Sequence, residues 1–111
     1  MILSSKELRT MSVLWRSGEP MTSEDIALAL YLDKQKARYV RRVGKQLHSL
    51  MKKNAIKLSP EFTQEGGLHF APTVTAEEVI AAFMEKYNKP RRRSLLLAAI
   101  DYIKRLITKD G

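Results

Sequence analysis

Positive side chains between Lys34 and Leu58 are the clearest chemical signal in this 111-residue sequence. The segment holds nine lysines and arginines and no aspartate or glutamate. Ammonium and guanidinium groups bind phosphate oxygens, and a guanidinium can do so through two parallel hydrogen bonds. Many charge runs are merely solvated, but a solvated helix face usually mixes both signs to gain pairs between residues four apart. A face of one sign therefore favours a polyanionic partner.

Two helices joined by a tight turn are expected to position these cations. Residues 22–30 predict a short helix opened by a capping box at residues 22–25. Residues 31–32 predict a turn, and residues 33–53 a longer helix with Asp33 as its N-cap. The inward positions are apolar: Ile26, Ala27, Leu30, Leu32, Ala37 and Val40. This layout is typical of a helix-turn-helix, whose second helix lies in the DNA major groove. Tyr31 departs from it, because many such turns carry glycine at a positive φ.

The outward positions form the candidate DNA-binding set. Residues in the first turns of the second helix are expected to read base edges: Lys34, Gln35, Arg38 and Tyr39. Other cations on this helix are expected to hold phosphates: Lys36, Arg41, Arg42 and Lys45. Thr22 and Ser23, at the start of the first helix of the pair, could place backbone N–H groups on a phosphate.

A further helix is expected to precede the pair. Residues 4–7 have the pattern of a capping box, and the helix should run to about Arg16 before residues 17–20 end it. Its apolar stripe is Leu8, Met11, Leu14 and Trp15. These residues predict a core helix and no chemistry.

The segment after the basic helix predicts a β-hairpin wing. The inward stripe of that helix continues through Val43, Leu47, Leu50 and Met51, with Gly44 allowing close approach of a neighbour and Asn54 as a left-handed cap. Residues 55–58 and 68–71 predict strands, with Ile56, Leu58, Leu68 and Phe70 on the core face. Residues 59–67 form the tip, where Gln64 and Gly66 could contact the DNA backbone. Glu61 and Glu65 count against tight contact there.

The last forty residues predict a helical hairpin. Residues 75–78 form a third capping box and open a helix to about Tyr87, and Pro90 fits the first turn of a final helix. The final helix is apolar over more of its girth than one packing face needs, so it must bury two sides. One side could pack on the preceding helix or on the first helix, and the other predicts a second copy of the chain as partner. The expected dimer contacts are Val79, Phe83, Leu95, Leu96, Ala99, Ile100, Ile103, Leu106 and Ile107. Residues 91–93, three arginines, could bind phosphate.

Composition narrows the classes of function. The net charge of +8 and the pI near 9.9 favour a nucleic acid or an anionic surface as partner. There is no cysteine, and two lone histidines (His48 and His69) give no metal site. No paired carboxylates, nucleophile triad or phosphate loop stand out, so we expect neither an enzyme nor a cofactor. No apolar run is long enough for a membrane span or signal peptide, so a cytoplasmic location is the expectation.

The chain resembles the penicillinase-repressor family, the BlaI/MecI type of winged-helix regulators. The resemblance is carried by Leu-Ser-Ser-Lys-Glu-Leu at 3–8, Met11, Val-Leu-Trp at 13–15, Gly-Glu-Pro at 18–20 and Thr22. Residues 50–56 resemble that family's entry into the wing, and residues 70–75 with Glu77 and Glu78 resemble its exit into dimerisation helices. The resemblance implies a homodimeric repressor on a dyad operator. That family is often induced by cleavage at an Asn-Phe bond, and copper-responsive relatives carry a cysteine cluster; this sequence has neither. Residues 37–39 also resemble small fimbrial winged-helix regulators, so activation stays open.

The expected fold is mainly α with an α+β wing: a winged helix-turn-helix domain at residues 1–72, then C-terminal dimerisation helices at 73–111. The expected function is sequence-specific binding of double-stranded DNA by a homodimeric transcriptional regulator. Two alternatives stay open. One is a winged-helix protein-interaction adaptor or co-regulator without sequence-specific DNA binding of its own. The other is a final helix that lies on an anionic membrane surface, which Asp101 disfavours.

Overall fold

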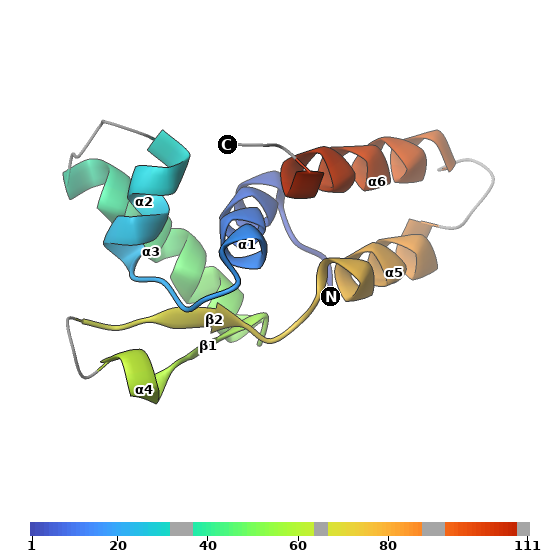
Figure 1. The fold of residues 1–111 in the computed structure, drawn as a ribbon. Coiled ribbons are helices and arrows are strands. Elements are labelled where there is room, and N and C mark those ends of the chain that lie inside the picture. The colour runs from blue at the N-terminus through green and yellow to red at the C-terminus, as the bar shows by residue number, and fades with distance from the viewer. Residues whose placement is uncertain (32–36, 64–66, 88–92, 109–111) are drawn as a thin grey trace.

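The computed structural model describes residues 1–31, 37–63, 67–87 and 93–108. The fold is mainly helical with a small two-stranded antiparallel sheet, as the sequence predicted (Figure 1). In chain order the elements are α1 (Ser5–Ser17), α2 (Ser23–Tyr31), α3 (Ala37–Lys52), β1 (Ile56–Leu58), α4 (Pro60–Thr63), β2 (Phe70–Pro72), α5 (Ala76–Tyr87) and α6 (Arg93–Thr108).

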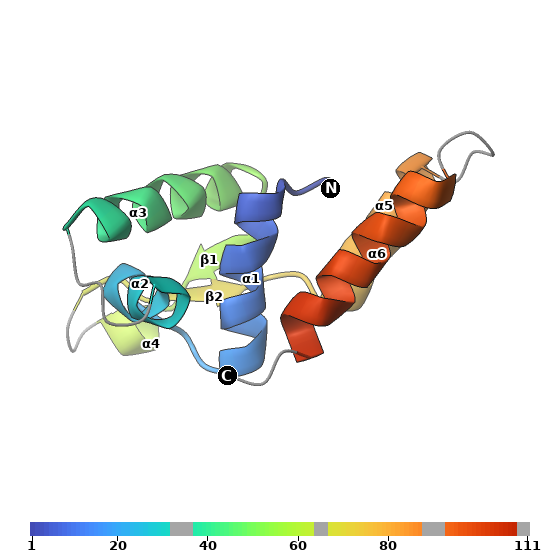
Figure 2. The ribbon, with the colours of Figure 1, turned by 90° about the horizontal axis from the view of Figure 1, so that it is seen from above.

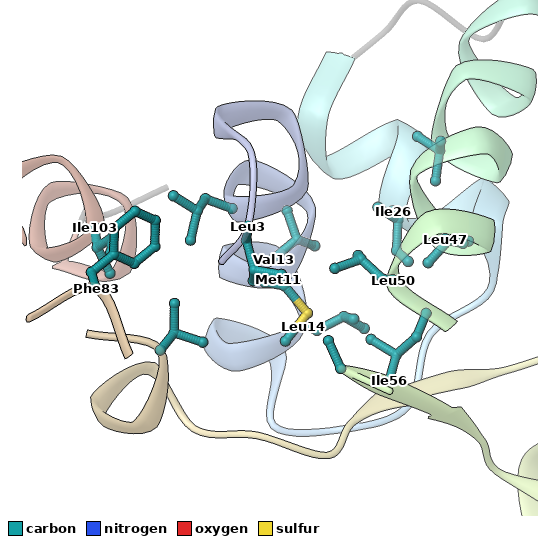
Figure 3. Close-up of a cluster of buried hydrophobic side chains, with 14 of the residues drawn as sticks. Leu3, Met11, Val13, Leu14, Ile26, Leu47, Leu50, Ile56, Phe83 and Ile103 are labelled. Carbon is teal, nitrogen blue, oxygen red and sulfur yellow. The ribbon is translucent and has the colours of Figure 1, made fainter. Parts of the chain in front are cut away.

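Helix α1 lies at the centre of the molecule and packs on both sides. Figure 3 shows Phe83 and Ile103 on one side of α1, with Ile26 and Leu50 on the other. Burial therefore extends beyond the single apolar stripe that the sequence predicted and includes Glu7 and two hydroxyl side chains, Thr10 and Ser12. Their hydroxyls donate to the helix's own carbonyls, at 3.2 and 2.6 Å, which removes the cost of burying them.

All three predicted capping boxes are present. The Ser4 hydroxyl accepts from the Glu7 N–H at 3.1 Å and the Glu7 carboxylate accepts from the Ser4 N–H at 2.8 Å. The pairs Thr22 with Asp25 and Thr75 with Glu78 repeat this exchange at α2 and α5. Gly18 ends α1 in the left-handed conformation, at φ 72°. The helix starts could be read from sequence because each box is a local pattern of four residues.

The α2–α3 pair differs from the prediction at its turn. Tyr31 is the last residue of α2, so the predicted turn does not begin there. Ile26 and Ala27 are buried, and Leu30 and Val40 are partly buried against the core, as expected. Leu32 and the predicted N-cap Asp33 lie outside the described residues, and so do the side chains of Ala37 and Arg38.

The inner face of α3 is narrower than predicted. Val43, Leu47 and Leu50 are buried, but Met51 is 37% exposed, because it lies about 100° around the helix from Leu50. The helix ends as predicted, with Asn54 at φ 59°. The N–H groups of Asn54 and Ala55 donate to the carbonyls of Met51 and Leu50, the paired bonds of a Schellman motif.

Gly44 was expected to allow a close approach, and this expectation was wrong. A Cβ placed on Gly44 would meet no atom within 4 Å.

The sheet is shorter than predicted and covers less of the core. Ile56 pairs with Pro72 and Leu58 with Phe70. Ile56 is buried and Phe70 partly buried, but Leu58 and Leu68 are 39% and 55% exposed, so their assignment to the core face was wrong. They lie where the hairpin extends past the edge of the core. The short helix α4 replaces part of the predicted loop, and a bridge from Met21 to Phe70 adds a third segment to the sheet.

Helices α5 and α6 form an antiparallel pair that lies beside α1 (Figure 2). Helix α6 contacts both α5 and α1, so one core cluster runs through the whole molecule. Four of the predicted dimer contacts are buried inside this single chain: Val79, Phe83, Leu96 and Ile103. Among the described residues, no helix is both long and apolar enough to cross a membrane.

Candidate nucleic-acid interface

The outer face of α3 carries positive charge without any acid. Residues 37–52 contain no aspartate or glutamate. Burial of Val43, Leu47 and Leu50 turns the opposite side of the helix to solvent. The exposed polar residues on α3 are Arg41, Arg42, Lys45, His48 and Lys52. Three predicted phosphate contacts, Arg41, Arg42 and Lys45, are therefore together on one accessible helix.

An aromatic stack links the two helices of the pair beside this face. The rings of Tyr31 and Tyr39 lie with their centroids 4.5 Å apart and tilted by 32°. The guanidinium carbon of Arg42 lies 5.5 Å from the centroid of the Tyr39 ring. A cation over an aromatic face gains about 0.5–1 kcal/mol at an exposed site. Tyr39 therefore helps to orient the Arg42 side chain. The sequence had predicted a different role for Tyr39, the reading of base edges.

A basic hollow that the sequence analysis missed lies between α1, the end of α2 and α3. Its volume is about 500 Å³, and the charged residues described in its lining are Lys6 and Arg9 of α1 with Arg42 and Lys45 of α3. Lys6 and Arg9 are exposed and three residues apart, so they share one face of α1. That spacing was visible in the sequence, but nothing local indicated that this face of α1 lies next to α3.

The opposite flank of α3, toward the sheet, has a different character. A second hollow of about 560 Å³ is lined there by Glu24, Gly44, Met51, Leu58 and Leu68, among others. Its exposed apolar side chains and one carboxylate do not suit phosphate.

The start of α2 is also a poor phosphate site. Thr22 is buried, at 9% exposure, and its hydroxyl accepts from the Asp25 N–H. Two carboxylates, Glu24 and Asp25, occupy the first turn. Negative side chains stabilise the helix start but would repel a phosphate there. This arrangement counts against the predicted contact at Thr22 and weakens the one at Ser23.

Several predicted contacts lie outside the described residues. These are Lys34, Gln35 and Lys36 before α3, and Gln64 and Gly66 in the hairpin tip. The same holds for the side chain of Arg38. The structure therefore describes most of the residues predicted to contact phosphates, but few of those predicted to read bases.

A buried carboxylate ties α1 to the end of α3. Glu7 is 2% exposed and accepts hydrogen bonds from the Ser4 N–H, the Ser49 hydroxyl and the Lys53 ammonium. Burial acts to raise the pKa of Glu7, but these hydrogen bonds and the charge of Lys53 outweigh it and lower the pKa below its ordinary value. Lys53 is neutralised by this pair, so the free basic surface of α3 ends before it.

No known protein family, curated protein or solved structure that was compared with this chain matches it. Across the described segments, no three histidine, aspartate or glutamate side chains gather as a metal site would need.

Proposed function

We propose that this protein is a DNA-binding transcriptional regulator that places α3 in the major groove of duplex DNA. The observation that carries the proposal is the acid-free outer face of α3, with Arg41, Arg42 and Lys45 exposed together. Duplex DNA offers a regular array of phosphates, and protein cations that neutralise them release counterions, which favours binding.

The way α3 is anchored supports this use of its outer face. Three buried residues fix the helix on the core, and the Tyr31–Tyr39 stack fixes its first described turn against α2. A helix held on one side by a core and on the other only by solvent can be inserted into a groove without unfolding. In this proposal the whole unit is a winged helix-turn-helix, with β1, β2 and the chain between them as the wing.

Reading of the DNA sequence is assigned to residues just before α3 in the sequence and in its first turn. Lys34, Gln35 and Arg38 carry the side chains that pair with guanine and adenine edges, at about 1–3 kcal/mol of discrimination each. Lys36, Arg41, Arg42 and Lys45 hold phosphates and set the register.

A homodimer is part of the proposal, and the α5–α6 pair carries its contact surface. At the end of this pair that lies away from α1, Met84, Leu95 and Leu97 are 47%, 65% and 60% exposed (Figure 2). Three large apolar side chains this exposed near the same end of a helix pair favour a protein contact there, although Leu95 and Leu97 lie on different faces of α6. Two copies joined there would present two α3 helices to an inverted repeat. Together with the resemblance to the penicillinase-repressor family, this favours a repressor.

Selection from a random duplex library tests the function. The purified chain is bound to the library in moderate salt, and retained duplexes are sequenced. We expect an inverted repeat whose half-sites are about one helical turn apart. Retention of duplexes without a common motif would contradict sequence-specific regulation.

Exposed apolar residues beside α3 favour a second candidate, a protein-interaction adaptor. Leu58 and Leu68 are open to solvent on the hairpin, next to Met51. An adaptor would bind no duplex, and light scattering would give a monomer until a protein partner is added. A regulator of the kind proposed would bind duplex alone.

A further inference from the structure

The basic hollow between α1 and α3 includes two cations, Lys6 and Arg9, that the proposed groove contact does not use. Lys6 and Arg9 project from α1, a helix that is central to the core and takes no part in the helix-turn-helix pair. They face the same space as Arg42 and Lys45 of α3. Four cations from two helices thus converge on one concave surface.

The charge of this hollow is unbalanced. Among the residues of its lining that the structure describes, none is acidic. Within the part of the chain that the structure describes, the only ion pairs are Lys53 with Glu7 and Arg105 with Asp101, so none of the four cations is paired. Clefts lined by charges of one sign concentrate the electrostatic field and attract counter-ions more strongly than a flat surface does. Bringing four like charges together is unfavourable unless an anion occupies the space between them.

We infer that this hollow is a phosphate-binding site. Arginine and lysine supply the two modes of phosphate recognition, the planar fork and the point charge. Tyr31 and Gln46 also line the hollow, and their side chains carry a hydroxyl and an amide that can form neutral hydrogen bonds. The volume of about 500 Å³ admits a group of linked phosphates and is within the usual range of small-ligand sites. The stack of Arg42 on Tyr39 holds one of the four cations in place before the anion arrives.

The phosphates could come from the backbone of the bound duplex or from a free small polyphosphate, and two measurements separate these sources. The first is calorimetric titration of the full chain with tripolyphosphate. The second is duplex affinity as a function of salt. Only the second rests on the proposed function, so a chain that binds no DNA would still report on the hollow through the first.

The test variant is Lys6→Ala/Arg9→Ala, which removes two exposed cations from α1 with a residue that favours helix. The matched control is Lys86→Ala/Lys104→Ala, which removes two exposed cations from α5 and α6. Circular dichroism and thermal melting establish that both variants are folded.

If the source is a free polyphosphate, the test variant should bind tripolyphosphate at least about tenfold more weakly than the control, with duplex affinity unchanged. If the source is DNA, the test variant should lose duplex affinity and its salt slope should fall by about 1.8, the value for two phosphate contacts. Equal behaviour of the test and control variants in both measurements would overturn the site.

Discussion

The Lys53 ammonium lies 2.7 Å from the Glu7 carboxylate, across 46 residues of sequence. Glu7 also belongs to the capping box of α1, and Lys53 follows the last residue of α3. One ion pair thus joins the first turn of α1 to the end of α3. It thereby helps to fix the angle between the two helices that line the basic hollow.

Lys53→Met should destabilise the fold by about 1–3 kcal/mol, because it leaves a buried carboxylate with one charged donor fewer. This loss of stability is smaller than that expected for breaking a fully buried ion pair, since the Lys53 side chain is 38% exposed. Chemical denaturation measures the change. Lys52→Met, at the exposed neighbour, is the matched control and should change the free energy of unfolding by less than about 0.5 kcal/mol. An equal effect of both substitutions would show that the pair does not hold the helices.

Acid should remove the contribution of Glu7. The folded chain lowers the pKa of Glu7 below its unfolded value of about 4.5, so the folded state favours the ionised form. Its contribution is therefore complete above pH 4.5 and is lost as the pH falls through the folded-state pKa. Unfolding free energies of the wild type and Glu7→Gln, measured between neutral and acidic pH, check this. The difference between the two should shrink as the pH falls, and a constant difference would contradict the assignment.

Gly44→Ala should stabilise the protein by about 1 kcal/mol, because alanine favours the helix interior and glycine does not. The added Cβ would meet no atom within 4 Å. Gly18→Ala provides the contrast, since Gly18 ends α1 at φ 72° and alanine there should destabilise by about 1 kcal/mol. Thermal unfolding of both variants measures the two shifts. A loss of stability in Gly44→Ala would mean that α3 is more crowded in solution than this structure has it.

Sequence reasoning succeeded where the signal was local. The capping boxes at Ser4, Thr22 and Thr75 and the left-handed cap at Asn54 each depend on a few adjacent residues, and all are present. The mainly helical fold with a small sheet followed from the same patterns.

Sequence reasoning was less successful where the burial of a residue depends on which other element packs against it. Alternation placed Leu58 and Leu68 on the core face, but the core ends before them, and both are exposed. The apolar girth of α6 predicted one side packed within the chain and the other against a second copy. Helices α1 and α5 do cover Leu96 and Ile103 within one chain, and the contact with a second copy stays a prediction. The proximity of Lys6 and Arg9 to α3 likewise depends on tertiary packing.

Leu95→Glu/Leu97→Glu should convert the proposed dimer into a monomer, because both side chains are exposed in the single chain and a charge there would oppose burial against a second copy. Light scattering coupled to size exclusion gives the mass. Leu68→Glu is the matched control, since it changes another exposed leucine on the hairpin and should leave the mass unchanged. A monomeric wild type, or a dimer that both variants retain, would refute the location of the contact.

The most direct test of the central claim is the salt dependence of duplex binding by wild type, Arg41→Ala/Lys45→Ala and Lys86→Ala/Lys104→Ala. Fluorescence anisotropy with a labelled duplex gives the affinity at each salt concentration. We predict that the wild type binds, that the α3 variant binds more weakly with a log-log slope lower by about 1.8, and that the α5–α6 variant of equal charge matches the wild type. No duplex binding, or an equal loss in both variants, would contradict the assignment of the outer face of α3 to DNA.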